Sequence, residues 1–154
     1  MPEDEEKKYG LQKYMISVTN KNTMFAVDTK TSNILWKKER DNNFKLISLI
    51  KLKEEYEREV AIAINYAKGF VILDQVHENG DIHTLSKIQV DSEPTVHKIS
   101  PHSIILRTQG KIHQYDINNK LKGFEKEYYW YEVNDRSIVG WKNVKSELHQ
   151  TWNF

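Results

Sequence analysis

The stretch Asn22–Lys38, NTMFAVDTKTSNILWKK, decides the fold. Apolar and polar residues alternate as far as Asp28, which is the pattern of a half-buried β-strand. A polar turn follows, and the return strand carries Trp36. This order of strand, aspartate, turn and tryptophan strand is compatible with three interpretations: an active site, a binding motif, or a connection between two strands.

A connection between strands explains the stretch without any ligand. The short carboxylate of Asp28 can accept hydrogen bonds from backbone amides two residues further on and so close the turn. We expect Asn33 to adopt a positive φ there, because asparagine tolerates the left-handed region better than most residues. We expect the indole of Trp36 to pack between neighbouring sheets, where truncation would cost about 3 kcal/mol or more.

Short alternating segments continue along the whole chain, separated by turn-forming residues. We predict strands at residues 14–19, 22–28, 34–37, 44–52, 60–65, 70–74, 81–88, 96–99, 104–108, 111–117, 128–133, 137–142 and 147–154. Only residues 52–59, LKEEYERE, have helical character. Because this stretch is polar nearly all round, a hairpin loop or a single helical turn is expected.

The opening motif recurs along the chain. Asp28, Asp74 and Asp116 hold the same place in three copies, and their separations are 46 and 42 residues. This period is close to the roughly 40 to 50 residues of one propeller blade. Asn134 holds the aspartate position in a shorter copy only 18 residues further on, which is either a second hairpin within one blade or the start of an irregular blade.

The repeats predict an all-β fold, namely a partial β-propeller of about three four-stranded antiparallel blades. The expected blades lie at residues 9–40, 44–92 and 95–154, after an acidic disordered lead-in at residues 1–8. Isolated blades leave unpaired strand edges, so we expect the chain alone to be a poor monomer. The repetition favours a structural role for Asp28 and its counterparts, because chemistry is rarely spread across repeats.

Composition excludes several classes of function. Lys and Arg number 23 against 22 Asp and Glu, so no basic excess favours nucleic acid or an anionic membrane surface. The chain has no cysteine, which excludes disulfides, a zinc-finger pattern and a thiol nucleophile. We expect no signal peptide and no membrane span, since no apolar run approaches about 18 residues.

The motif resembles the blade repeat of quinoprotein-type, PQQ-like β-propellers. Two further stretches, YGLQK at Tyr9–Lys13 and EYYWYEVNDRSIVGWKNVKSELHQTW at Glu127–Trp152, resemble the family of ER membrane protein complex subunit 1. The likeness is good over residues 9–38 and 127–152, moderate over 95–126 and faint over 40–92. Asn33 replaces the turn glycine that is usual in that family.

The resemblance implies a non-enzymatic scaffold segment of a lumenal propeller in the endoplasmic reticulum. The parent assembly inserts tail-anchored and multipass membrane proteins into the membrane. Its other subunits and the remaining blades of the same chain would be the partners, with no nucleic acid and no membrane insertion by this segment. No catalytic, cofactor-binding or metal-binding residue carries over, and the residues expected to matter structurally are Asp28, Trp36, Asp74, Asp116 and Trp152.

Other candidate sites have weaker support. The six histidines show no metal-ligand spacing, so no metal site is expected. Quinone binding would need a full ring of blades, so no cofactor is expected either. The aromatic run suggests a possible protein interface at Tyr129, Trp130 and Tyr131, although a strand buried on both faces would also be aromatic.

Two alternative functions stay open from the sequence. One is the lumenal unfolded-protein sensor domain of a stress-sensing kinase, since such sensors also use PQQ-like β repeats. The other is a fragment of a quinoprotein enzyme, which calcium-dependent quinone absorbance would reveal.

Overall fold

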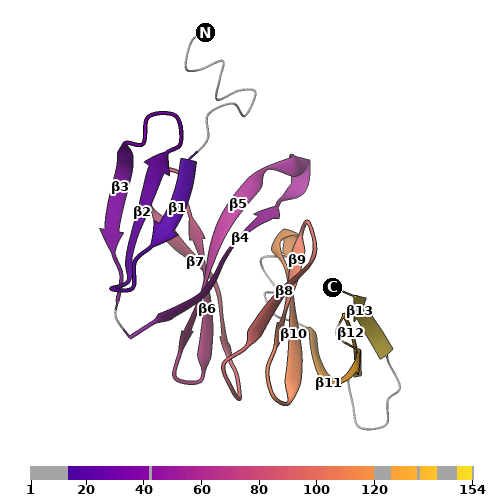
Figure 1. Cartoon of the computed structure of the whole chain (residues 1–154). Helices are drawn as coiled ribbons and strands as arrows, with labels where there is room; N and C mark the ends of the chain where they lie inside the picture. The colour runs from indigo at the N-terminus through magenta and orange to yellow at the C-terminus, as the bar shows by residue number, and fades with distance from the viewer. Residues whose placement is uncertain (1–13, 42, 120–125, 135, 142–148, 154) are drawn as a thin grey trace. The chain divides into compact units, whose positions relative to one another are not determined.

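Thirteen strands and two short 3₁₀ turns make up the computed structural model of the chain, which describes residues 14–41, 43–119, 126–134, 136–141 and 149–153 (Figure 1). The strands are β1 (Tyr14–Val18), β2 (Thr23–Asp28), β3 (Ile34–Glu39), β4 (Lys45–Lys53), β5 (Glu59–Ala67), β6 (Phe70–Val76), β7 (Ile82–Gln89), β8 (Thr95–Ser100), β9 (Ser103–Arg107), β10 (Lys111–Asp116), β11 (Lys126–Asn134), β12 (Ser137–Trp141) and β13 (His149–Asn153). All thirteen predicted strands are confirmed. The polar stretch at 52–59 forms both expected features, since the 3₁₀ turn η1 (Glu55–Glu57) caps the β4–β5 hairpin.

The chain divides into two compact units, residues 1–44 with 77–81, and residues 45–76 with 82–154. The first unit contains an antiparallel sheet in the order β1-β2-β3. The strand β2 alternates as predicted: Met24 and Ala26 are fully buried, whereas Phe25 between them is half-buried. The acidic lead-in expected at residues 1–8 lies outside the described residues.

The second unit contains a four-stranded antiparallel sheet in the order β4-β5-β6-β7. Its two central strands are mostly apolar and largely buried, as expected of strands covered on both faces. β4 and β5 form a long hairpin whose pairing runs from Lys45 opposite Tyr66 to Lys53 opposite Glu59.

A six-stranded antiparallel sheet in the order β13-β12-β11-β10-β9-β8 completes the second unit. The three sheets therefore have three, four and six strands instead of about four each. The third sheet is larger because β11 pairs directly with β10, with Lys111 opposite Tyr129, and this pairing adds the next hairpin to the same edge. The short copy at Asn134 thus forms the β11–β12 hairpin in the same sheet as β8, β9 and β10.

The core of the second unit is shared by its two sheets. Its main cluster is built of aliphatic side chains and one tyrosine, and its buried members are Leu52, Val60, Ile62, Ile64, Val71, Leu73, Val90, Ile104, Leu106, Tyr115 and Ile117. A smaller cluster lies within the six-stranded sheet and consists of Ile105, Ile112, Tyr128, Ile138 and Trp152. Burying these apolar surfaces supplies the main driving force for folding of this unit.

None of the helical segments in the described part of the chain has the length and apolar character that crossing a membrane requires.

Candidate functional site

Asp28 closes the turn between β2 and β3. Its Oδ1 accepts hydrogen bonds from the backbone N–H of Lys30 at 2.8 Å and of Thr31 at 3.4 Å. The prediction of a positive φ at Asn33 is wrong, because Ser32 takes that conformation with φ 61°. Asn33 lies directly before the return strand β3, and its carbonyl accepts the N–H of Asp28 at 2.9 Å. The left-handed residue therefore falls one position earlier.

Asp116 makes the same kind of local turn at the end of β10. Its Oδ1 accepts the N–H of Asn118 at 2.8 Å, at the start of the 3₁₀ turn η2 (Ile117–Asn119). The turn places Ile117 fully inside the main core cluster. Asp28 and Asp116 thus each fix the local path of the chain where a strand ends.

Asp74 is used differently from the other two aspartates. It lies within β6, where its Oδ2 accepts the side-chain amide of Asn65 at 3.1 Å and its Oδ1 accepts the Thr84 hydroxyl at 2.8 Å. The expectation that all three repeats use the acid to close a turn does not hold here, because β6 continues to Val76. The carboxylate consequently bridges three adjacent strands.

Trp36 lies against the turn of residues 77–81, which clusters with the first unit. Its Nε1–H donates a hydrogen bond of 2.7 Å to the carbonyl oxygen of Glu78. A Cβ on Gly80, whose φ is 93°, would lie only 2.9 Å from the indole Cδ2. The side chain is half-buried, so the indole covers a turn instead of filling a closed core between sheets.

Trp152 occupies the closed position that was expected of Trp36. It is 3% exposed and meets the ring of Tyr128 edge to face, with centroids 5.2 Å apart. A Cβ on Gly140 would lie 2.6 Å from its Cζ3, so only glycine leaves room for the indole. Trp152 therefore joins the last strand to the small core cluster of the six-stranded sheet.

Among the three candidate interface residues of the aromatic strand β11, the side chain of Trp130 is described. Trp130 is half-buried, its Nε1–H donates to the carbonyl oxygen of Thr108 at 3.0 Å, and Arg107 lies over its ring at 5.1 Å. The backbones of Tyr129 and Tyr131 pair with β12, but their side chains lie outside the described residues. The interface expected at these three residues stays a prediction.

A polar joint that sequence reasoning missed connects the two sheets of the second unit. The N–H of Lys53 donates to the carbonyl oxygen of Pro101 at 2.7 Å, and Nδ1 of His102 lies 2.6 Å from the carbonyl oxygen of Lys53. The N–H of Glu55 donates to Oδ1 of Asn118 at 2.9 Å. Pro101 lies directly after β8, and no sequence pattern indicates its contact with Lys53, almost fifty residues away.

A second missed contact holds the β9–β10 turn. The carboxylate of Asp91 accepts the Ser92 hydroxyl at 2.9 Å and the N–H of Gly110 at 3.2 Å, and a Cβ on Gly110 would come within 2.8 Å of it. Burial alone would raise the pKa of Asp91, but hydrogen bonds from Thr108, Ser92 and Gly110 outweigh it, so the pKa lies below its ordinary value.

Tyr115 is the ionisable group in the main core. Burial raises the pKa of Tyr115 to about 12, and the carboxylates of Asp116 and Glu54 add to the rise. The phenol is therefore neutral at physiological pH. It acts as a packing residue between the two sheets, with its ring in the main core cluster.

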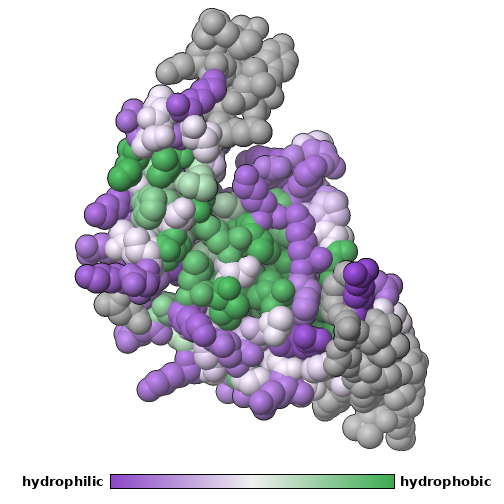
Figure 2. All heavy atoms as spheres, viewed as in Figure 1, coloured by the Kyte–Doolittle hydropathy of each residue, from purple (hydrophilic) through white to green (hydrophobic). Residues whose placement is uncertain are grey.

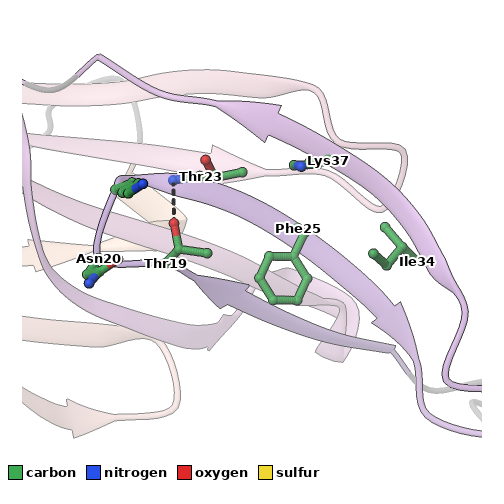
Figure 3. A pocket seen from close by; sticks show the side chains of 7 residues that line it. Thr19, Asn20, Thr23, Phe25, Ile34 and Lys37 are labelled. Atoms are coloured by element: carbon green, nitrogen blue, oxygen red, sulfur yellow. Dashed lines mark hydrogen bonds between the residues drawn. The ribbon is translucent and has the colours of Figure 1, made fainter.

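An open hollow of about 410 Å³ lies on the three-stranded sheet (Figure 3). Phe25 and Ile34 give it an apolar wall, and the Thr19 hydroxyl beside it accepts the N–H of Thr23 at 3.1 Å. Lys37 adds a positive charge. Within the described residues, no three His, Cys, Asp or Glu side chains converge as a metal site would require.

Antiparallel sheets repeated along the chain, with turns closed by aspartate and tryptophans packed over glycines, define a β-propeller-type segment. The sequence model of the family described as "ER membrane protein complex subunit 1, second beta-propeller" matches residues 10–154. The chain belongs to this family, which confirms both the all-β propeller fold and the family resemblance stated above.

Comparison with solved structures adds two distant likenesses. Hsv2 of Kluyveromyces lactis is 9% identical with a TM-score of 0.44 over 85% of this chain and 39% of that one. BamB from Moraxella catarrhalis is 14% identical with a TM-score of 0.44 over 89% of this chain and 45% of that one. The chain therefore spans less than half the length of either protein. A comparison with curated proteins gave no match.

Proposed function

We propose that this chain is a non-enzymatic scaffold segment in the lumenal part of the ER membrane protein complex, which inserts tail-anchored and multipass proteins into the membrane. The observation that carries the proposal is the family match over residues 10–154. Scaffold here means a surface that holds other subunits in place and needs no cofactor and no metal of its own.

The contacts of the conspicuous polar residues support a scaffold role. Asp28 and Asp116 bond to backbone amides of their own turns, and Asp74 bridges neighbouring strands. Nδ1 of His102 lies within hydrogen-bonding distance of a backbone carbonyl in the neighbouring sheet. These side chains serve the rigidity of the sheets, and rigidity is what a docking surface needs if partners are to bind without ordering it first.

The partners proposed are other subunits of the complex and further blades of the same polypeptide. β1 and β3 are the edge strands of the first sheet among the described residues, and an edge strand offers unpaired backbone groups to another strand. Pairing along such an edge would explain why the chain by itself is expected to associate.

Membership of the complex is tested by purification. The full-length chain that contains these residues, tagged and expressed at its natural level, is expected to bring down the other subunits from solubilised ER membranes. The same chain with residues 14–153 deleted is expected to bring down fewer. Purification without any of those subunits would overturn the proposal.

Lumenal placement has a separate test. The Asp81→Thr substitution creates an Asn-Gly-Thr glycosylation acceptor at Asn79, an exposed position in the turn between β6 and β7. A lumenal segment gains a glycan, seen as an endoglycosidase-sensitive shift on a gel, whereas Asp81→Ala in the same turn gains none. A chain that stays unmodified in both variants would contradict a lumenal location.

A further inference from the structure

Tyr56 stands at the tip of the β4–β5 hairpin in a conformation that its side chain disfavours. It is 97% exposed, with φ 66° and ψ 22°, and Glu57 beside it has φ 62°. A turn position with positive φ favours glycine or asparagine, and for a bulky residue it is an outlier. Neither packing nor local preference explains a tyrosine there. Strained residues of this kind gather at functional sites.

The tip is held firmly despite its exposure. The N–H of Glu54 donates to the carbonyl oxygen of Arg58 at 2.8 Å, and Nε of Arg58 donates to Oε2 of Glu54 at 2.9 Å. The N–H of Glu57 donates to the carbonyl oxygen of Glu54 at 3.1 Å. Asn118 of the neighbouring sheet anchors the tip through the N–H of Glu55. The phenol ring is thus presented outward on a fixed base.

The surroundings of the ring are acidic. Residues 53–59 carry four glutamates against one lysine and one arginine, and Figure 2 shows hydrophilic side chains gathered around this tip. Lys53 and Arg58 are already paired within the hairpin, with Glu57 and Glu54 respectively. Glu55 is left without an ion pair among the residues that the structure describes, so the tip offers a negative charge beside the ring.

A hollow of about 510 Å³ adjoins the ring. Tyr56 and Arg58 line it from the hairpin, and Ile117 and Asn119 line it from the neighbouring sheet. It has room for the alkyl stem of a long side chain, whose charged end would then reach Glu55, which also lines the hollow. Aromatic ring, negative charge and adjoining hollow together are complementary to an arginine or a lysine.

We propose that Tyr56 anchors a docking surface for an arginine- or lysine-rich segment of another subunit of the complex, which rests on the function proposed above. The guanidinium or ammonium group lies over the Tyr56 ring and pairs with Glu55. A rigid tyrosine that enters a partner is the kind of residue that carries a large share of binding energy. The strained turn is retained because it presents the Tyr56 ring to the partner.

Site-specific crosslinking tests the partner directly. The full-length chain is expressed in cells with the photoreactive residue p-benzoylphenylalanine at position 56, or at Lys68 as the matched control. Lys68 is also an exposed turn residue of the same sheet, at the other end of β5. We expect irradiation to link position 56, but not position 68, to an arginine- or lysine-rich segment of one subunit, located by mass spectrometry.

Three results would overturn the proposal while leaving the proposed function intact. They are no crosslink from position 56 in a chain that still purifies with the complex, equal crosslinks from both positions, and a crosslink to a segment without basic residues. A chain that purifies without the complex would overturn the proposed function, and this docking surface with it.

Substitution separates docking from a structural role. Asparagine tolerates the positive φ, so Tyr56→Asn is expected to leave the melting temperature of the full-length chain unchanged or raised. The same variant should recover the crosslinked subunit about tenfold less well, as for loss of a binding anchor, and Glu55→Lys should weaken recovery through charge repulsion. Full recovery by Tyr56→Asn, or a loss of recovery that merely follows a fall in melting temperature, would refute the docking role.

Discussion

Trp36 and Trp152 both lie over a glycine, yet they stabilise the protein in different ways. Trp152 is 3% exposed and completes a closed apolar cluster. Trp36 is half-buried and bonds through its indole nitrogen to a backbone carbonyl. The first contact depends on buried area and shape, and the second on one hydrogen bond and the cover of a single turn. Two tryptophans that each lie over a glycine are therefore expected to stabilise the protein to different degrees.

The largest expected effect is that of Trp152→Ala. Removing a buried tryptophan from a packed cluster should lower the free energy of unfolding by about 3–5 kcal/mol. Urea unfolding of the full-length chain, followed by hydrogen exchange in β12 and β13, measures it. Trp36→Ala serves as the comparison. An equal loss of unfolding free energy in both variants would show that the different exposure of the two tryptophans does not determine how much they stabilise the protein.

Gly140→Ala should come next in size. The added Cβ would lie 2.6 Å from Trp152 and 3.0 Å from the Cβ of Tyr128, both inside a closed cluster. Overpacking of this kind costs about 1–3 kcal/mol. The double variant with Trp152→Phe, which frees space, should lose less than the sum of the single losses. Strict additivity in this double-mutant cycle would argue against the contact.

Gly80→Ala is expected to cost about 1–2 kcal/mol, chiefly because an alanine at φ 93° is strained. The half-exposed ring of Trp36 can move outward, so the steric part should be smaller than at Gly140. Hydrogen exchange of residues 77–81 provides the measurement. Gly80→Asn, which tolerates positive φ better, should cost less than alanine if strain dominates.

Trp36→Phe keeps an aromatic ring but removes the bond to Glu78, and we expect a loss of about 1 kcal/mol. The same change at Trp152 removes a nitrogen that has no hydrogen-bond partner among the described residues. There the loss should come from volume alone. Thermal unfolding of Trp36→Phe and Trp152→Phe at equal protein concentration measures the two losses of stability. If added salt changed which variant loses more, the bond from Trp36 to Glu78 would not be a hydrogen bond between neutral groups.

Protonation of Asp91 at low pH should destabilise the second unit, and this is the smallest of the expected effects. Because the folded pKa of Asp91 lies below its ordinary value near 3.8, its contribution is present above that value. It is lost as the pH falls through the lower, folded pKa. Trp36 bonds to a backbone carbonyl, which does not titrate in this range. Unfolding is measured for the unsubstituted protein and for Asp91→Asn between neutral pH and about pH 3. The pH dependence of stability should differ between the two proteins, chiefly in the second unit.

The strands were predictable because alternation is a local signal. The turn before β3 was predictable from Asp28, whose hydrogen bonds reach only two or three residues along the chain. Asp74 was not predictable in the same way, since its partners Asn65 and Thr84 are set by strand register. The same local sequence pattern therefore leads to different contacts at Asp28 and Asp74, because the pairing between strands determines where each turn falls.

The polar joint between the sheets and the tip at Tyr56 escaped sequence reasoning for a related reason. LKEEYERE is polar nearly all round, so no periodicity in the sequence indicated that Tyr56 would be exposed at the tip of the hairpin. Lys53 meets Pro101 and Glu55 meets Asn118 across nearly fifty and more than sixty residues. Such contacts follow from the packing of two sheets, which a single sequence does not encode in any short window.

The first unit is discontinuous in the chain, and this has a consequence for its synthesis. Residues 14–44 leave the ribosome well before residues 77–81, which supply the carbonyl and the glycine that cover Trp36. At about 5–20 residues per second, this delay lasts a few seconds. During that time the indole of Trp36 is uncovered, which gives chaperones a defined interval in which to act.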